Sequence, residues 1–242
     1  MRIEFDKFNS EIFQNKIGNI LDIRDDTNYH EIEKIIKLSM DEQYNFLFTK
    51  INTNFQNVVN RFINKKFNLI DTQVTYCLKC KDNIVQRKVV DGISFRKFKK
   101  SDISDIAAIA SMSFFLDQFH LDKDLDSQMC NRYYEQWAIN SCNGFADDVF
   151  VLDNGKLIGF ITVNYCVDNA TVGLAAISPF FQGKGFFNLL ISETICELRN
   201  NGINMLYYGT QLCNAPVHKT MGKFQGALIS SAYVLHKKLC KV

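Results

Sequence analysis

The stretch SPFFQGKGFF, residues 178–187, combines the residue types that an anion site requires, between a strand-like and a helix-like apolar run. The first N–H groups of a helix have no internal partners, and the helix dipole adds partial positive charge there. Gly183 and Gly185 would let the backbone approach a phosphate closely, and Gln182 and Lys184 add side-chain donors. The sequence predicts a phosphate-binding turn here, and a tight turn without a ligand is the alternative.

Two common phosphate motifs do not fit this turn. A P-loop would read GxxxxGK[ST], and a dinucleotide fingerprint would need glycine at 188, where the sequence has Asn188. The longer segment AISPFFQGKGFFNLLI instead resembles the acetyl-CoA motif of the GNAT acyltransferases, in which Gln182 and Gly185 match defining positions. Phe187 departs from the pattern, because glycine or alanine is usual there. The resemblance implies that acetyl-CoA is bound by Gln182, Gly183, Lys184, Gly185, Phe186 and Phe187.

The resemblance extends to the two strands that flank this motif. It implies that the backbone of Ala175, Ala176 and Ile177 holds the pantetheine arm and the thioester carbonyl of acetyl-CoA. Hydrogen-bond donors at such a carbonyl stabilise the developing oxyanion. The segment TQLCNAPVH looks like the next element of the family, in which Asn214 would lie beside the pantetheine arm.

The residue that would protonate the leaving thiolate in the family is absent from this sequence. In the family it is a tyrosine seven residues after the asparagine, and here that position is Met221, which has no acidic proton. His218 lies three residues before it on a predicted helix, so His218 is our candidate for the acid. Tyr207, Tyr208 and Tyr233 stay open as alternatives, as does protonation by water.

A wider resemblance covers nearly the whole chain. FLDQFHLD, YYEQWAINS, GFADDVFVL and KLIGFITV occur in the order found in the dTDP-fucosamine acetyltransferase family, which acetylates an amino group on a nucleotide-linked deoxysugar. The resemblance places Phe119, His120 and Asp122 on the acceptor side, and His120 could take the amine proton. Tyr134 is a candidate for sugar contact, although a core position is the alternative. The alternative for His120 is that it is a loop residue that orients the chain.

The pattern of apolar residues predicts the elements that must position these side chains. Strands are expected at 45–52, 68–78, 93–98, 148–153, 157–165, 171–177, 203–209 and 227–239, and helices at 54–67, 101–119, 127–140 and 186–200, with a short helix after 214. Ser101 and Asn214 are expected as N-caps, and Gly202 as a helix terminator.

The predicted fold is α/β (α+β). The GNAT resemblance implies a central mixed, mostly antiparallel sheet with splayed strands and flanking helices. A polar seam, residues 79–92, ends in the turn Asp91-Gly92. We therefore predict a small N-terminal α/β domain over residues 1–90 and an acyltransferase domain over residues 91–242.

The composition narrows the function classes. The 242 residues are 47% hydrophobic and carry a formal net charge of +2, so we expect a globular protein that binds neither nucleic acid nor a membrane. The N-terminus does not resemble a signal peptide, and the eight cysteines suit reduced thiols in a cytoplasmic protein without a bound metal. The expected enzyme is an N-acetyltransferase that uses acetyl-CoA and a small amine, with a non-catalytic CoA-binding protein or an amino acid or peptide acceptor as alternatives. A homodimer stays open.

Overall fold

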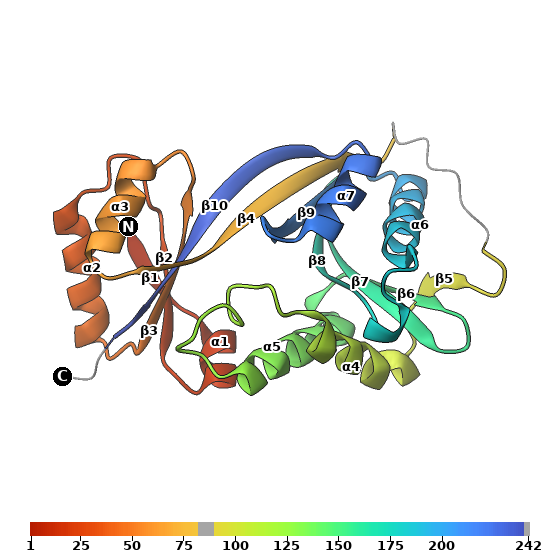
Figure 1. Cartoon of the computed structure of the whole chain (residues 1–242), viewed down its shortest axis with the longest axis horizontal. Helices are drawn as coiled ribbons and strands as arrows, with labels where there is room; N and C mark the ends of the chain where they lie inside the picture. The colour runs from red at the N-terminus through yellow and green to blue at the C-terminus, as the bar shows by residue number, and fades with distance from the viewer. Residues whose placement is uncertain (82–89, 240–242) are drawn as a thin grey trace.

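The computed structural model describes residues 1–81 and 90–239, in which ten strands form one mixed, mostly antiparallel sheet (Figure 1). The strand order is β1-β2-β3-β10-β4-β9-β8-β7-β6-β5. The strands are β1 (Arg2–Phe5), β2 (Ile17–Leu21), β3 (Phe46–Asn52), β4 (Asn68–Lys79), β5 (Ser94–Lys97), β6 (Asp148–Asp153), β7 (Leu157–Cys166), β8 (Asn169–Ile177), β9 (Met205–Gln211) and β10 (Ala227–Lys238). This architecture confirms the predicted α+β class.

The helices pack on both sides of the sheet. They are α1 (Lys7–Phe13), α2 (Tyr29–Asp41), α3 (Gln56–Asn64), α4 (Ile103–Ser113), α5 (Ser127–Asn140), α6 (Phe186–Asn200) and α7 (Ala215–Lys223). One core lies between the sheet and α1, α4 and α5, and a second lies under α6 and α7. A third joins α2 and α3 to the N-terminal strands. Within the described residues, none of the helices has the length and apolar character that crossing a bilayer requires.

Local signals explain most of these elements. The β6–β7 hairpin turns at Asn154-Gly155, where Gly155 has a positive φ of 92°. Helix α6 ends at Asn200, and Gly202 follows in the left-handed conformation with a φ of 80°. Asn214 occupies the N-cap position of α7, although its side chain makes no capping hydrogen bond.

The predicted helix 101–119 is wrong at both ends. Residues 100–102 form a 3₁₀ turn, and the N-cap of α4 is Asp102 rather than Ser101. The Asp102 carboxylate accepts the N–H of Lys99 at 2.7 Å and the guanidinium of Arg96 at 2.6 Å, which fixes the entry into the helix. The helix ends at Ser113 because Phe114 turns extended and stacks on Tyr134, with ring centroids 4.3 Å apart. Residues 114–126 therefore form a loop, and this loop carries part of the site.

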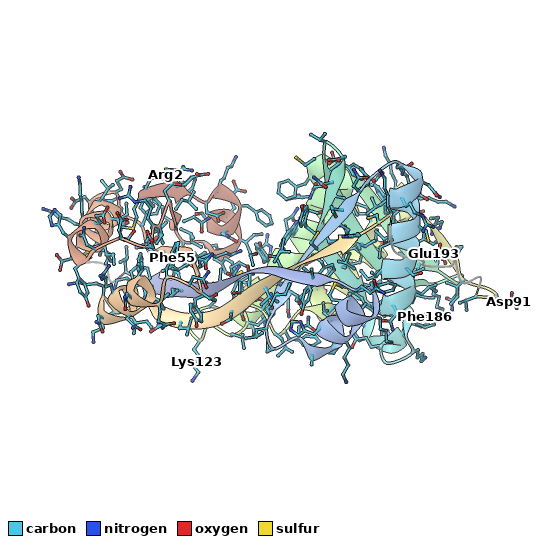
Figure 2. All side chains as sticks on the ribbon, turned by 90° about the horizontal axis from the view of Figure 1, so that it is seen from above. Arg2, Phe55, Asp91, Lys123, Phe186 and Glu193 are labelled. Carbon is cyan, nitrogen blue, oxygen red and sulfur yellow. The ribbon has the colours of Figure 1, made fainter. Side chains whose placement is uncertain are left out.

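Strand β4 joins the two ends of the molecule. It lies between β9 and β10, and β10 continues on to pair with β3. Figure 2 shows β4 and β10 running from the N-terminal strands to the lobe that contains α6. Of the polar seam, residues 82–89 lie outside the described residues, while Gly92 has the positive φ expected of the turn. The domain boundary at residue 90 stays a prediction, and it would separate strands that pair in one sheet.

Candidate active site

A cavity of about 970 Å³ opens where β8 and β9 separate. The two strands pair in parallel from Asn169 opposite Met205 to Val172 opposite Tyr208, and the pairing ends there. Beyond that point β8 continues to Ile177 beside β7, and β9 continues to Gln211 beside β4. The separated strand ends, the start of α6, helix α7 and the loop after α4 all line the cavity.

The glycine turn forms one end of this cavity. Gly183 and Gly185 have φ values of 76° and 83°, a left-handed conformation that side chains disfavour. A Cβ added at either glycine would meet nothing within 4 Å, so the space beside the backbone is open. Gly185 is the N-cap of α6 and provides no side-chain cap, which leaves the first N–H groups of the helix for a ligand. These features fit a diphosphate group.

Gln182 and Lys184, the predicted side-chain donors of the turn, contact other parts of the protein. The Gln182 amide donates to the carbonyl of Ile177 at 3.0 Å, so it ties the turn to the end of β8. Lys184 does not line the cavity, and its ammonium lies 5.6 Å from the centroid of the Phe181 ring. Lys219 and Lys223 on α7 do line the cavity, and neither forms an ion pair with a described residue. These two lysines place positive charge at the cavity, and the role of Lys184 in binding the cofactor stays a prediction.

The backbone of β8 presents alternate amides to the cavity. Ser178 N–H donates to the carbonyl of Ile158 at 2.8 Å, and the register pairs Ala176 with Phe160. Because hydrogen-bonded pairs alternate in an antiparallel ladder, the Ala176 N–H faces β7. The N–H groups of Ala175 and Ile177 point the other way, into the gap left by β9. Of the three predicted residues, Ala175 and Ile177 therefore offer amides to a pantetheine arm.

Phe186, Phe187 and Asn214 also line the cavity, as expected for a cofactor site. The Phe187 ring packs edge-on against Tyr208, with centroids 6.2 Å apart, so its bulk is directed toward β9. The Asn214 amide has no hydrogen-bond partner among the described side chains and backbone groups, and it is available to a ligand.

His218 does not line the cavity. Its Nδ1 lies 3.0 Å from the hydroxyl of Tyr76, and its Nε2 lies 2.9 Å from the carbonyl of Leu212. Nε2 therefore carries a proton that it donates to Leu212, and Nδ1 accepts from Tyr76. Both nitrogens are engaged away from the gap between β8 and β9, so this geometry does not favour His218 as the thiolate acid. Met221 is fully buried in the core under α7.

Tyr208 is the tyrosine best placed to replace the missing acid. It lines the cavity opposite Val172, at the point where β8 and β9 separate. Burial raises the pKa of its phenol above the usual value, so the hydroxyl stays protonated and able to donate. Tyr207 and Tyr233, the other two alternatives, do not line the cavity.

The part of the cavity that is lined by the loop after α4 and by α5 is the candidate acceptor chamber. Phe119 and Tyr134, the predicted acceptor residues, line this chamber together with Asp117 and with Lys50 of β3. Asp122 does not reach the cavity, because its carboxylate binds Nδ1 of His236 at 2.7 Å within the core. Burial lowers the pKa of His236 more than the Asp122 carboxylate raises it.

His120 does not line the chamber either, but it contacts a residue that does. Its Nδ1 lies 2.5 Å from the carboxylate of Asp117. Sequence reasoning missed Asp117, although it belongs to the segment FLDQFHLD from which His120 and Asp122 were taken. It also missed Lys50 of β3 and Gln73 of β4, which reach the same cavity because β10 pairs with both of these strands.

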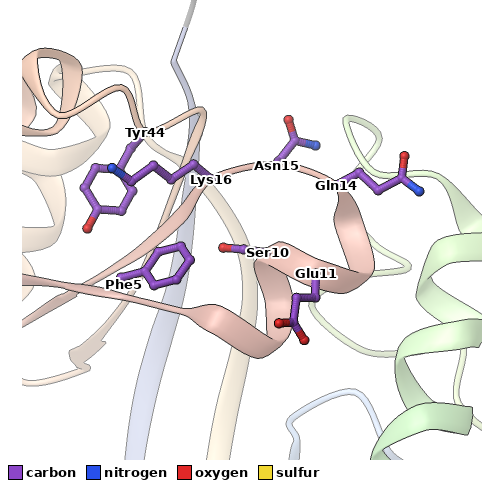
Figure 3. Close-up of a pocket in the computed structure, with 7 residues that line it drawn as sticks. All are labelled: Phe5, Ser10, Glu11, Gln14, Asn15, Lys16 and Tyr44. Carbon is purple, nitrogen blue, oxygen red and sulfur yellow. The ribbon is translucent and has the colours of Figure 1, made fainter.

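A second hollow lies on the surface of the N-terminal segment (Figure 3). It is an open depression lined by Phe5, Ser10, Glu11, Gln14, Asn15, Lys16 and Tyr44. The Lys16 ammonium lies 4.5 Å from the centroid of the Tyr44 ring and donates to the carbonyl of Glu42. The ammonium of Lys16 therefore already has partners within the protein, and Glu11, the other charged residue of the hollow, lies 3.8 Å from the Lys7 ammonium.

The geometry predicts that Gly185→Val weakens CoA binding by about tenfold or more, about 1.4 kcal/mol. Valine at a φ of 83° strains the turn, and its side chain would fill the open space beside the first amides of α6. Calorimetric titration with CoA measures the change, with thermal unfolding as the check on folding. Gly92→Val provides a matched control, because Gly92 also has a positive φ but lies away from the cavity. An unchanged CoA affinity in folded Gly185→Val protein would contradict the phosphate site.

Comparison with known proteins agrees with this geometry. Residues 107–227, half of the chain, match the acetyltransferase (GNAT) family. The chain belongs to the GNAT family. Among solved structures, this GNAT protein is similar to a conserved protein of unknown function from Staphylococcus epidermidis ATCC 12228, with a TM-score of 0.69 and 12% identity over 99% of this chain and 92% of that one. It is also similar to a tandem GNAT protein from the clavulanic acid biosynthesis pathway, with a TM-score of 0.62 and 10% identity over 92% of this chain and 75% of that one. These structures show the fold.

Two curated relatives align with parts of this GNAT chain. It is 25% identical over 136 residues to the spore coat polysaccharide biosynthesis protein SpsD of Bacillus subtilis, covering 56% of this chain and 47% of SpsD. It is 32% identical over 65 residues to the ribosomal protein bS18-alanine N-acetyltransferase of Haemophilus influenzae, covering 27% of this chain and 44% of that enzyme. The chain thus spans less than half the length of the curated relatives it matches.

Proposed function

We propose that the chain transfers the acetyl group of acetyl-CoA directly to the amine of a dTDP-linked amino-deoxysugar. The observation that carries the proposal is the single cavity that joins the glycine turn, the gap between β8 and β9, and the acceptor chamber. A thioester held in the gap would face the chamber, and positioning of this kind can contribute about 7–11 kcal/mol to a bimolecular reaction.

Each step of the transfer has a candidate group in this chain. The amides of Ala175 and Ile177 would hold the pantetheine arm and polarise the thioester carbonyl, because they face the gap. A neutral amine would attack the carbonyl carbon, the new C–N bond would form, and the C–S bond would break. Tyr208 would give its proton to the leaving thiolate, since this residue lines the cavity at the point where the two strands separate.

Two sequence likenesses support the sugar acceptor. The segments around Phe119 and Tyr134 resemble those of the dTDP-fucosamine acetyltransferase family, and both residues line the acceptor chamber. SpsD, to which the chain is similar, is named for polysaccharide biosynthesis. Aromatic rings such as Tyr134 and Trp137, stacked with centroids 6.3 Å apart, suit the apolar faces of a sugar.

A panel of amines tests the proposal. Purified protein is given acetyl-CoA with dTDP-linked amino-deoxysugars, with free amino sugars, with amino acids and with a peptide that begins with alanine. Turnover is followed by the thioester absorbance, because the eight cysteines would react with a thiol dye. We expect the dTDP-linked sugars to have the highest kcat/KM. Faster acetylation of the peptide would favour a protein substrate instead, and CoA binding without turnover of any amine would favour a binding protein.

A further inference from the structure

Asp117 is the one acidic residue among those that the structure places on the cavity wall. It is 2% exposed and lies in the loop between α4 and α5. Its Oδ1 accepts the N–H of Phe119 at 2.8 Å and that of His120 at 3.3 Å. These bonds fold the loop around the carboxylate and fix its direction. Asp117 therefore presents a buried, rigidly held negative charge to the acceptor chamber.

A line of hydrogen bonds leads from Asp117 to the surface. Its Oδ2 lies 2.5 Å from Nδ1 of His120, whose Nε2 lies 2.9 Å from Oδ1 of Asn131. Asn131 is exposed on α5, while the His120 side chain is only 10% exposed. The His120 ring lies nearly parallel to that of Tyr134, with centroids 6.1 Å apart, so it cannot swing freely. The imidazole thus connects the cavity wall to solvent in a fixed orientation.

This environment favours the protonated imidazole. Burial lowers the pKa of His120, but the hydrogen bonds to Asp117 and Asn131 and the charge of Asp117 outweigh it and raise the pKa above the usual value. The other titratable groups that interact with Asp117 are Asp71 on β4 and Cys130, Tyr133 and Tyr134 on α5. Lys50 of β3 lines the same chamber and interacts with Asp71, and Asp122 and Asp126 of the loop interact with Cys130. The raised pKa favours an imidazolium at His120 beside the Asp117 carboxylate.

We propose that Asp117 receives the proton of the acceptor's ammonium group and that His120 passes a proton to solvent beside Asn131. The inference rests on the proposed function, because it assumes that the acceptor is an amine. An amine is protonated at neutral pH and cannot attack a thioester until it loses that proton. A negative charge on the chamber wall also attracts the ammonium form, so the same group would bind the acceptor and make it reactive.

The protons balance in this scheme. The ammonium gives its proton to the Asp117 carboxylate as His120 releases the Nε2 proton to water. The pair then holds a carboxylic acid and a neutral imidazole, with the same total charge as before. Because Nδ1 still carries the proton that it donates to Asp117, the carboxyl proton is lost to water in the emptied chamber and Nε2 takes a proton from solvent, which restores the carboxylate and the imidazolium. Asp117 would be the catalytic residue, and His120 would act through it.

The first test needs no acceptor. The chain has four histidines, and the pKa of His120 can be followed by NMR titration of its ring nitrogens. We expect Asp117→Asn, which keeps Oδ1 for the loop amides, to lower this pKa by about one unit or more. Asp124→Asn is the control, because Asp124 lies in the same loop but is exposed. An unchanged His120 pKa in folded Asp117→Asn protein would overturn the coupling, whatever the enzyme acetylates.

The second test uses the best amine of the panel. Asp117→Asn is expected to lower kcat about a hundredfold and to remove the acid limb of the pH profile, with unchanged CoA affinity. His120→Gln is expected to shift that limb, while Asp124→Asn leaves the profile unchanged. A wild-type profile in Asp117→Asn would exclude it as the proton acceptor. If no amine is acetylated, the proposed function fails and this inference falls with it, although the NMR result still decides the coupling.

Discussion

A chain that begins at residue 90 is expected not to fold. It would lack β4, which pairs with β9 over its last seven residues and with β10 along most of its length. Both strands would then expose unpaired backbone groups inside the sheet. The core would also lose Leu78, which is fully buried with Leu206 under α6 and α7. Circular dichroism and thermal unfolding of the 90–242 chain measure the effect.

The control for this deletion is a chain that begins at residue 67. It keeps β4 and both of its pairings, and it removes β1, β2 and β3 with α1, α2 and α3, so that β10 becomes an edge strand. We expect this chain to unfold cooperatively and to retain CoA binding, because the glycine turn and the gap between β8 and β9 stay intact. Cooperative unfolding with CoA binding in the 90–242 chain would instead show that β4 is dispensable and would support a domain boundary at residue 90.

Tyr208→Phe is expected to lower kcat by a hundredfold to ten-thousandfold, the usual contribution of a general acid. The substitution removes the hydroxyl and keeps the ring that packs against Phe187, so folding and CoA affinity should change little. Turnover of the best amine is measured by thioester absorbance, and CoA affinity by calorimetry. We expect this loss because the CoA thiolate is a poor leaving group unless it receives a proton.

Two variants serve as controls for Tyr208. Tyr207→Phe removes a hydroxyl from the neighbouring residue, whose side chain points to the other face of β9. His218→Ala tests the acid that the sequence suggested, and we expect kcat to stay within about tenfold of wild type, below the range of a general acid. A larger loss in His218→Ala than in Tyr208→Phe would return the role to His218, and normal turnover in both would indicate protonation by water.

The sequence alone predicted those features that depend on residues close together in the chain. The strand–glycine–helix order of residues 171–200 predicted the turn, and both glycines have the left-handed conformation that makes glycine necessary. The hairpin at Asn154-Gly155 and helix α5 are also where the pattern placed them. Such features are predictable because φ preferences, unpaired helix amides and apolar periodicity act over a few residues.

Tertiary structure decided which side chains reach the cavity. His218 has the right chemistry, but α7 turns it toward Tyr76 of β4 instead of toward the gap. His120 contacts the cavity wall only through Asp117, which lines the cavity from the loop after α4. Tyr208 was one of three open alternatives until the end of the β8–β9 pairing distinguished it. The physical reason is that successive side chains of a strand point to opposite faces of the sheet. The pairing and register of strands that are distant in the sequence therefore determine which side chains face the cavity. The insertion of β4 between β9 and β10 is such a pairing, and no local pattern in the sequence encodes it.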